Sequence, residues 1–373
     1  MKVTIHKLFD YLLETTASAP PECFIGFSLA RSPKLGDFLA DLDPDLSLDW
    51  NGVSFLGLPA LRQRVLDQAG LRLSPDTVLV TAGAAEANYL LFRQLLQAGD
   101  EIITEAPGWP QAGVMARAIG ATLVEVPRDE ANGWWLDPEA VAKAITPRTR
   151  MIFLTNPNNP TGRLIPEGDL RALAALADRH GIWLVVDEVY AGLEWAGPRP
   201  PAIAGMTPFG ITTGSVSKAL GLQGLRTGWM ICQTPGVIRD AMILRENSSE
   251  IMNSLGEHIA EIALRPDRLT ASLTRARDEG RATLDRMDAF VAAEPRLTWV
   301  GPEAGLIGLA RLDGIDGESL ARRLLEPPYR TFLLPGSAYG CPSHIRLGVG
   351  GGPETRLAEG LGRLSTLLHA WAD

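Results

Sequence analysis

Residues 214–226 have the sequence GSVSKALGLQGLR and follow the apolar, strand-like run 209–213. Lys218 is one of five lysines in the chain, and it alone lies among small, hydroxylated and glycine residues. Other groups can approach this lysine closely, serine hydroxyls flank it, and Arg226 follows it. These are the surroundings expected of an amine that forms a Schiff base with a phosphate-bearing aldehyde. The alternative is a surface lysine on a glycine-rich loop, and the rest of the chain decides between the two.

The length and composition of the chain limit the classes of protein to consider. With 373 residues it exceeds the size at which one core keeps growing, so we expect two domains. A hydrophobic content of 46% and a charged content of 21% are typical of a globular protein. The net charge of -9 and the scattered arginines argue against nucleic acid as a partner.

Cysteine and histidine usage gives no sign of disulfides or metal ligands. Cys23, Cys232 and Cys341 are odd in number, far apart and without CxxC spacing, and the histidines show no ligand spacing. We therefore expect no metal site. The N-terminus lacks a signal-peptide pattern, and no apolar run approaches the length of a membrane span. These features predict a soluble, cytoplasmic protein with no membrane partner.

Strand-like and helical patterns alternate through the middle of the chain. Near-continuous apolar runs of this kind predict a mostly parallel sheet covered by helices, which is an α/β fold. The predicted strands are 78–81, 101–104, 121–126, 151–155, 182–186, 211–213 and 229–231, and a helix is predicted over 84–96. After Pro266 a long helix is predicted over 269–287, followed by short strands around 297–300, 306–309 and 345–349. We thus predict a large α/β domain over residues 45–265 and a smaller α+β domain made of residues 1–44 and 266–373.

Chemically useful residues follow the predicted strands, where open α/β sheets bind their ligands. Small residues open a helix whose first amides could cradle a phosphate, although an ordinary tight turn is the alternative. An indole could cover a flat ring, unless it is a core tryptophan. A turn with two X-Pro steps presents amide side chains at fixed positions. These residues are Ala84 and Ala85, Trp109, and Asn159 within Asn156-Pro157-Asn158-Asn159-Pro160-Thr161-Gly162.

Asp187 ends the all-apolar strand 182–186. A carboxylate there is costly to bury unless it meets a cation or a donor, and a protonated pyridine nitrogen would be such a partner. An aspartate that caps the next helix is the alternative. Together with Ser215, Lys218 and Arg226, these strand ends offer what is needed to hold pyridoxal 5′-phosphate. The absence of a GxGxxG motif counts against a nicotinamide cofactor.

Taken in chain order, the motifs resemble those of fold-type I pyridoxal-phosphate enzymes of the aspartate aminotransferase superfamily, the class I/II aminotransferases. The resemblance covers nearly the whole chain and implies that family's transferase fold, with a mostly parallel central sheet, helices on both faces and a smaller α+β domain. The motifs are Gly57-Leu58-Pro59-Ala60-Leu61-Arg62, Asn159-Pro160-Thr161-Gly162, Asp187-Glu188-Val189-Tyr190, Ser215-x-Ser217-Lys218, Gly224-Leu225-Arg226-x-Gly228-Trp229 and His344-Ile345-Arg346-Leu347-Gly348.

The resemblance implies roles around the cofactor ring. Lys218 would form the Schiff base and move the proton at the substrate Cα, and Asp187 would pair with the pyridinium nitrogen. Asn159 and Tyr190 would hydrogen-bond the ring hydroxyl, and Trp109 would stack on the ring.

It also implies how the phosphate and the substrate are bound. The amides of Ala84 and Ala85, with Ser215 and Arg226, would bind the phosphate. Arg346 would clamp the substrate α-carboxylate, with Asn159 beside it. Because active sites of this family lie at a dimer interface, a homodimer is implied.

One position departs from the family pattern. Typical aminotransferases carry a tyrosine five residues before the glycine that corresponds to Gly57, and this chain has Gly52 there. This segment, the N-terminal run 8–14 and the run 217–226 are similar to capreomycidine synthase, a member that acts on a hydroxylated arginine. Besides an aminotransferase of a small-molecule L-amino acid, a cyclase, eliminase or oxidase of an arginine-like amino acid in specialised metabolism therefore stays open.

The N-terminal segment is predicted to close over the substrate. Glu14 could bind the distal cation of a guanidino or amino-bearing substrate. The alternative is a solvated amphipathic helix with Leu8, Tyr11 and Leu12 packed inward.

A binding protein is the third class considered, since some transcription regulators carry this fold behind a DNA-binding domain. In this chain the α/β core begins by about residue 50, and the negative net charge disfavours binding to DNA. Both features argue against a transcription regulator.

Overall fold

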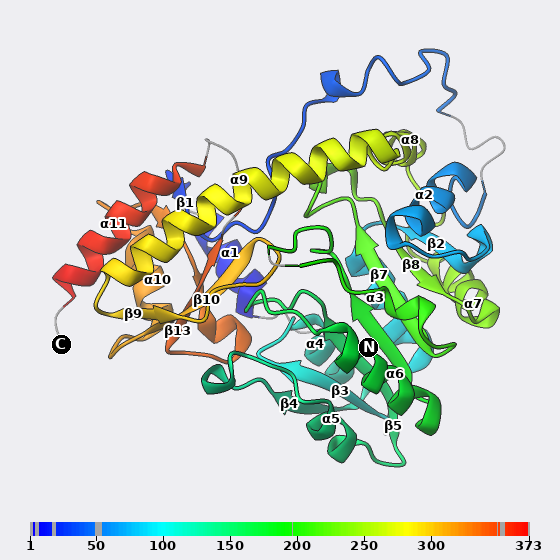
Figure 1. The fold of residues 1–373 in the computed structure, drawn as a ribbon, viewed down its shortest axis with the longest axis horizontal. Helices are drawn as coiled ribbons and strands as arrows, with labels where there is room; N and C mark the ends of the chain where they lie inside the picture. The colour runs from blue at the N-terminus through cyan, green and yellow to red at the C-terminus, as the bar shows by residue number, and fades with distance from the viewer. Residues whose placement is uncertain are drawn as a thin grey trace.

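The structure is a computed structural model that describes residues 7–16, 20–48, 54–195, 197–348 and 355–371, together with Val3 and Gly350. A sheet of seven strands lies at the centre of its larger part (Figure 1), in the order β2-β8-β7-β6-β5-β3-β4. The strands are β2 (Val78–Thr81), β3 (Glu101–Ala106), β4 (Thr122–Pro127), β5 (Thr149–Thr155), β6 (Trp183–Asp187), β7 (Gly210–Ser215) and β8 (Gly228–Cys232).

All neighbouring strands of this sheet are parallel except for the two pairs made by β8, which runs antiparallel to β2 and to β7. The chain reaches β8 through residues 216–227, which contain one short 3-10 turn and no crossover helix. A parallel pair needs such a crossover, so β8 returns in the opposite direction. The mostly parallel α/β sheet predicted from the sequence is confirmed.

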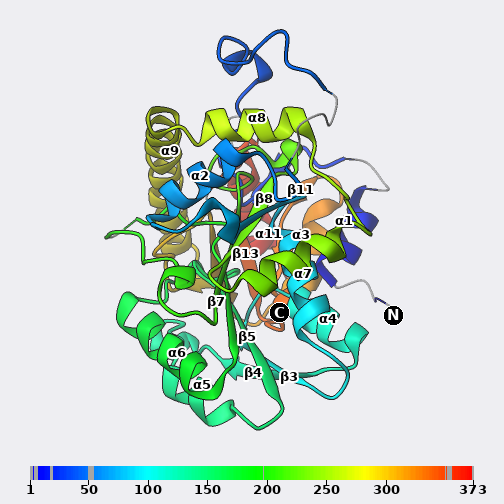
Figure 2. The same cartoon turned by 90° about the vertical axis from the view of Figure 1, so that its right-hand side faces the viewer.

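Helices cover both faces of this sheet (Figure 2) because successive side chains of a strand point to opposite faces. Met151 and Phe153 of β5 pack in the apolar core under α3, α4 and α7, whereas Ile152 and Leu154 pack under α5 and α6. A third core joins α2 and α8 to β2 and β8. The helices are α2 (Pro59–Ala69), α3 (Ala84–Leu95), α4 (Gln111–Ile119), α5 (Pro138–Ala144), α6 (Glu167–His180), α7 (Pro235–Arg245) and α8 (Ser254–Ala263).

The remaining elements build a second, smaller part around an antiparallel sheet of order β12-β13-β10-β9. The long helix α9 (Pro266–Ala293), which contains the predicted helix 269–287, connects the two parts (Figure 1). The other elements are β9 (Leu297–Trp299), β10 (Ile307–Leu312), α10 (Gly317–Leu325), β11 (Thr331–Phe332), β12 (Leu334–Pro335), β13 (His344–Gly348) and α11 (Leu357–Ala370). We propose the two domains predicted from the sequence: a large domain of residues 45–265 and a smaller domain made of residues 1–44 and 266–373.

The N-terminal segment joins the two parts next to Lys218. Helix α1 (Lys7–Thr16) buries Tyr11, and β1 (Cys23–Phe24) pairs in parallel with β11. The Ala30 N–H donates to the main-chain oxygen of Lys218 at 3.0 Å, and the Gly348 N–H donates to that of Ile25 at 2.8 Å. A Cβ at Gly348 would lie 1.9 Å from the main-chain oxygen of Phe27, so only glycine allows this close approach.

A search of the described helices for a membrane-spanning segment found none that is both long and apolar enough.

Candidate active site

A cavity of about 360 Å³ opens at the carboxyl ends of β5, β6 and β7, where the smaller part faces the large sheet. Its lining includes every site residue predicted from the sequence except Glu14. The residues brought together are Ala84, Ala85, Trp109, Asn159, Asp187, Tyr190, Ser215, Lys218, Arg226 and Arg346.

Asp187 is buried at the end of β6, and both of its carboxylate oxygens accept hydrogen bonds. Asn88 Nδ2 donates to Oδ2 at 2.8 Å, and the Val189 N–H donates to Oδ1 at 3.1 Å. Thr213 Oγ1 donates to Asn88 Oδ1 at 2.9 Å, so the NH₂ end of the amide must face Asp187. Burial nevertheless raises the pKa of Asp187 to about 6. This carboxyl group is poised to bind a cation.

Helix capping was the alternative role predicted for Asp187, and no role was predicted for Asn88. The chain forms turns rather than a helix directly after Asp187, which excludes capping. Asn88 lies on the buried face of α3 beside Ala87. A role for Asn88 could have been predicted, because it is an asparagine on the apolar face of a helix that starts at the site.

Lys218 is half-buried, with its Nζ 5.7 Å from the ring centroid of Tyr190. Burial lowers the pKa of Lys218 to about 8; the positive charges of Arg346 and Arg226 act in the same direction, and the negative charge of Asp187 opposes them. A larger fraction of this amine than usual is therefore neutral near pH 7, and an amine must be neutral to attack a carbonyl carbon. Burial raises the pKa of Tyr190, which therefore keeps its proton.

The N-terminus of α3 and Arg226 make one end of the cavity cationic. Gly83 at the N-cap offers no side-chain acceptor to the first amides of the helix, those of Ala84 and Ala85. The Arg226 guanidinium lies against this turn, and a Cβ on Gly83 would come within 2.7 Å of Nη2. Ser215 lines the same cavity. Helix N-terminal amides beside a guanidinium favour a phosphate group.

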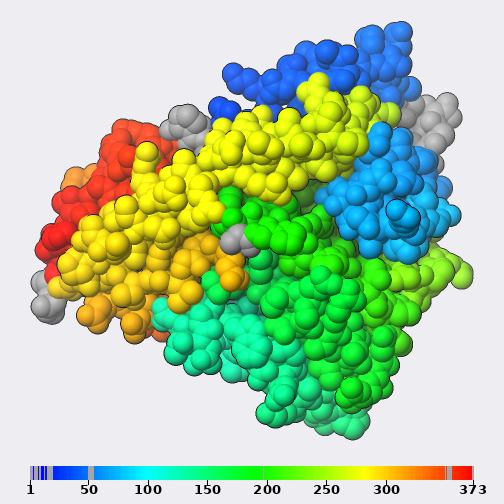
Figure 3. Space-filling view, viewed as in Figure 1, coloured from blue at the N-terminus to red at the C-terminus, as the bar shows by residue number. Residues whose placement is uncertain are grey.

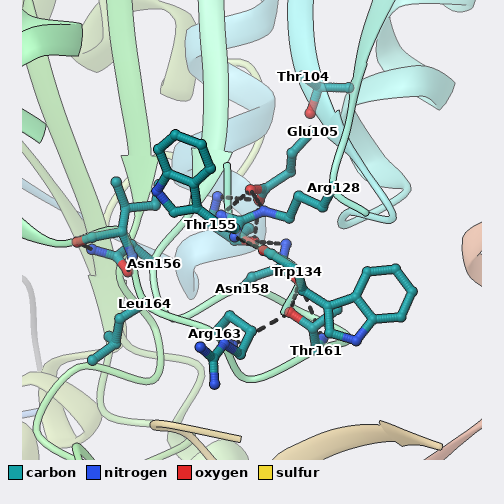
Figure 4. A network of polar contacts seen from close by, with 12 residues as sticks. Thr104, Glu105, Arg128, Trp134, Thr155, Asn156, Asn158, Thr161, Arg163 and Leu164 are labelled. Carbon is teal, nitrogen blue, oxygen red and sulfur yellow. Dashed lines mark hydrogen bonds and ion pairs between the residues drawn. The ribbon is translucent and has the colours of Figure 1, made fainter. Parts of the chain in front are cut away.

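A buried network holds the turn 156–162 (Figure 4). Asn159 lies in this turn. Glu105 and Arg128 form an ion pair at 2.7 Å with both side chains almost completely buried. Oε1 of Glu105 accepts from the N–H and the Oγ1 of Thr155, at 2.8 and 2.6 Å. Thr155 Oγ1 in turn accepts from the Asn159 N–H at 3.2 Å. The ion pair thus supports the position of Asn159, and losing either partner would leave a buried charge unpaired.

This ion pair was not predicted from the sequence. Glu105 comes after the apolar residues of β3, and a charged residue at this position indicates a polar role. Its partner could not be identified from the sequence, because Arg128 lies beyond the next strand in the chain.

Arg346 on β13 is buried and held by three segments of the chain. Nη1 donates to Asn159 Oδ1 at 3.2 Å and to the Tyr339 hydroxyl at 2.8 Å, and Nη2 donates to the Gly26 main-chain oxygen at 2.9 Å. Its Nε has no hydrogen-bond partner among the described residues. The guanidinium is thus fixed in place and keeps donor capacity for an acidic ligand.

The structure does not bring Glu14 to this cavity. Its carboxylate forms an exposed ion pair with Arg322 at 2.7 Å, on the outer side of the smaller part. The predicted contact with substrate therefore has no support within one chain. The departure at Gly52 lies outside the described residues.

The comparisons with known proteins agree with this geometry. Residues 51–364 match the family described as aminotransferase class I and II. The chain belongs to this family. It is 32% identical over 325 residues to the probable aspartate/prephenate aminotransferase of Thermus aquaticus, covering 84% of this chain and 82% of that protein.

Two solved structures of similar proteins cover the aminotransferase fold from end to end. A PLP-dependent aminotransferase from Streptococcus suis 89-1591 matches with a TM-score of 0.91 and 25% identity over 100% of both chains. The PLP-dependent cyclase OrfR matches with a TM-score of 0.86 and 28% identity, over 100% of this chain and 99% of that one. The resemblance predicted from the sequence is confirmed, and the protein is a PLP-dependent aminotransferase that acts on amino acids.

The cavity of this aminotransferase fits pyridoxal 5′-phosphate. It has an uncapped helix N-terminus and a guanidinium for the phosphate, a buried acid for the ring nitrogen and a lysine for the aldehyde. Among the residues that the structure describes, no cluster of histidine, cysteine, aspartate or glutamate suits a metal ion.

Proposed function

We propose that the residues of this cavity divide the work of amino transfer among them. Lys218 binds the cofactor and moves the proton at the substrate Cα, Asp187 pairs with the ring nitrogen, and Trp109 covers the ring. Tyr190 and Asn159 hydrogen-bond the ring hydroxyl. The observation that carries the proposal is the presence of the Lys218 amine in one cavity with the buried acid Asp187.

When bound, the cofactor supplies an electron sink that makes the Cα proton of an amino acid removable. Asp187 favours a protonated ring nitrogen, because a buried carboxylate gains more from a cation than from its present neutral donors. Asn88 and Thr213 keep this carboxylate in one orientation. The pKa of Lys218, about 8, lies close to neutral pH, where a group can both accept and return a proton.

At the phosphate end, the proposed partners are the Ala84 and Ala85 amides, Ser215 and Arg226. At the substrate end, Arg346 binds the α-carboxylate, with Asn159 beside it. The support is the geometry of the guanidinium, whose two Nη atoms are held by hydrogen bonds and whose Nε has no hydrogen-bond partner in the part of the chain that the structure describes.

An amino-acid panel tests the reaction type. Protein loaded with pyridoxal 5′-phosphate is mixed with single L-amino acids, and the cofactor absorbance and the product masses are followed. A keto acid and an aminated cofactor support amino transfer. A cyclised or eliminated product, with the amino group not transferred, would instead support the alternative left open by the similarity to capreomycidine synthase, a cyclase, eliminase or oxidase of an arginine-like amino acid.

Tyr339→Phe should weaken substrate binding without slowing the chemistry. The hydroxyl of Tyr339 accepts from Arg346 Nη1 at 2.8 Å, and its loss removes the shorter of the two hydrogen bonds that position this nitrogen. A hydrogen bond to a charged group contributes about 1.5–3 kcal/mol, so we expect KM to rise about tenfold with kcat within about twofold. Steady-state kinetics check this. Tyr329→Phe, outside the cavity, is the matched control, and an unchanged KM in Tyr339→Phe would refute the positioning role.

We also propose a homodimer. Segment 32–48 stands at the edge of the molecule, above α8 and α9 in Figure 3 (blue over yellow). In this segment Leu35, Leu39 and Leu48 are each more than half exposed in the single chain. Grouped apolar side chains of this kind support a protein-covered surface. Light scattering should give twice the chain mass of 40.2 kDa, and a fully active monomer would contradict the proposal.

A cytoplasmic location is proposed as well. Cys23, Cys232 and Cys341 are free thiols, of which the first two are buried. Unpaired cysteines support a reducing compartment.

A further inference from the structure

We propose that the preferred amino acid has an uncharged, apolar side chain, and that an aromatic one fits best. This inference rests on the proposed function, because it assumes that the substrate amine meets Lys218 and its carboxylate meets Arg346. With both of these groups fixed, the wall between the smaller part and the N-terminal segment remains for the side chain.

This wall is apolar. Phe27, Leu29, Phe332 and Leu334 line the cavity on this side. Phe27 is 38% exposed, although it stacks on Phe24 with ring centroids 5.0 Å apart and an interplanar angle of 19°. It also contacts Phe332, with centroids 6.1 Å apart. An aromatic side chain placed against Phe27 would cover this ring and extend the aromatic cluster.

The main chain that carries this wall is held on both sides. The Ile25 N–H donates to the Phe332 main-chain oxygen at 2.9 Å, and Gly348 packs against the main chain of Phe27. The Ala30 N–H is bonded to the loop of Lys218. Phe27 is therefore presented from a fixed backbone, which favours selection by shape.

Within one chain, the described residues that line the cavity offer no spare charge to a charged side chain. Among the described lining residues, the basic side chains are Lys218, Arg226 and Arg346, and the acidic one is Asp187. Each has a role in the proposed function. A second carboxylate would need another cation, and a guanidinium would need another acid, because burying either unpaired is costly.

The carboxylates of the N-terminal segment are used elsewhere. Glu14 pairs with Arg322, and Glu22 pairs with Arg330 and Arg363 at 3.1 and 2.7 Å. None of these side chains lines the cavity. The segment therefore contributes apolar contacts to the substrate rather than charge.

The first test compares kcat/KM for L-phenylalanine, L-leucine, L-alanine, L-aspartate and L-arginine in the cofactor-loaded enzyme. We expect phenylalanine to be the best substrate, with aspartate and arginine slower by about tenfold or more. A preference for aspartate or arginine overturns this inference and leaves the proposed function standing. Reaction with none of them overturns both.

The second test locates the preference at Phe27. Phe27→Ala should lower kcat/KM for phenylalanine by about tenfold and leave that for alanine within about twofold, because the small side chain does not reach the wall. Trp135→Leu removes an exposed aromatic outside the cavity and should change neither value. Equal losses for both substrates in Phe27→Ala would refute the assignment.

The third test measures binding without turnover. Calorimetry on the cofactor-loaded enzyme should show that 3-phenylpropionate binds at least about tenfold more tightly than succinate, and that Phe27→Ala removes most of this difference. Phe27→Arg should raise the affinity for succinate relative to 3-phenylpropionate. Tighter binding of succinate by the unaltered enzyme would overturn the proposal.

Discussion

Lys218→Ala is expected to abolish turnover, lowering kcat by about four orders of magnitude or more. The variant loses both the amine that holds the cofactor and the base that moves the substrate proton. The neighbouring charges of Arg346, Arg226 and Asp187 remain, so the cavity keeps its affinity for a phosphate and a carboxylate. Single-turnover absorbance measurements with an amino acid in excess check this result.

Two further lysine variants sharpen the test. Lys218→Arg keeps the positive charge but should be equally inactive, because a guanidinium does not give up its proton at neutral pH. Lys143→Ala, on the exposed face of α5, should retain full activity. Turnover within about tenfold of the unaltered enzyme in Lys218→Ala would show that another group performs the proton transfer.

Asp187→Asn is expected to lower kcat by about two to four orders of magnitude, because a neutral amide does not favour a protonated ring nitrogen. The amide is close in size to the carboxylate, and its oxygen keeps one of the two hydrogen bonds that Asp187 accepts, so the fold should be retained. Stopped-flow measurement of the half-reaction gives the rate. A variant that keeps its kcat would remove Asp187 from the mechanism.

The same variant should remove a pH-dependent cost of folding from the cofactor-free protein. The pKa of Asp187 is about 6 in the folded chain, above its ordinary value of 3.8, so ionisation of this group opposes folding. The cost grows as pH rises from about 4 to 6 and is constant above that range. Urea unfolding should therefore show that the free energy of unfolding of Asp187→Asn gains about 1–3 kcal/mol on that of the unaltered protein between pH 4 and pH 8. A difference between the two proteins that stays the same over this pH range would contradict this account.

Much of the site was predictable from the sequence because it lies at strand ends. A buried strand produces an apolar run, and the polar residue that ends the run is visible without any knowledge of the fold. Asp187 and Lys218 were found in this way, and the resemblance to aminotransferases added Arg346. The structure then showed that these residues line one cavity.

The supporting residues were not predictable in this way, because their partners are distant in the chain. Asn88 meets Asp187 across 99 positions, and Arg346 needs Asn159 across 187. Glu105 has the same property, since its bonds to Arg128 and Thr155 depend on how the strands are ordered. Glu14 differs in the opposite way: a substrate contact was predicted for its carboxylate, and within one chain this carboxylate pairs with Arg322.

The direction of β8 was also hidden from a pattern of apolar runs. A strand buried on both faces has the same composition whether it runs parallel or antiparallel. The short connection 216–227 sets the direction, and it also brings Arg226 to the edge of the sheet where Lys218 lies.

The most direct test of the account is to identify the residue that carries the cofactor. The enzyme loaded with pyridoxal 5′-phosphate is reduced with borohydride, digested and mapped by mass spectrometry. The account predicts a pyridoxyl group on Lys218 in the peptide that contains residues 214–226. A pyridoxyl group on any of the other lysines, with Lys218 unmodified, would contradict it.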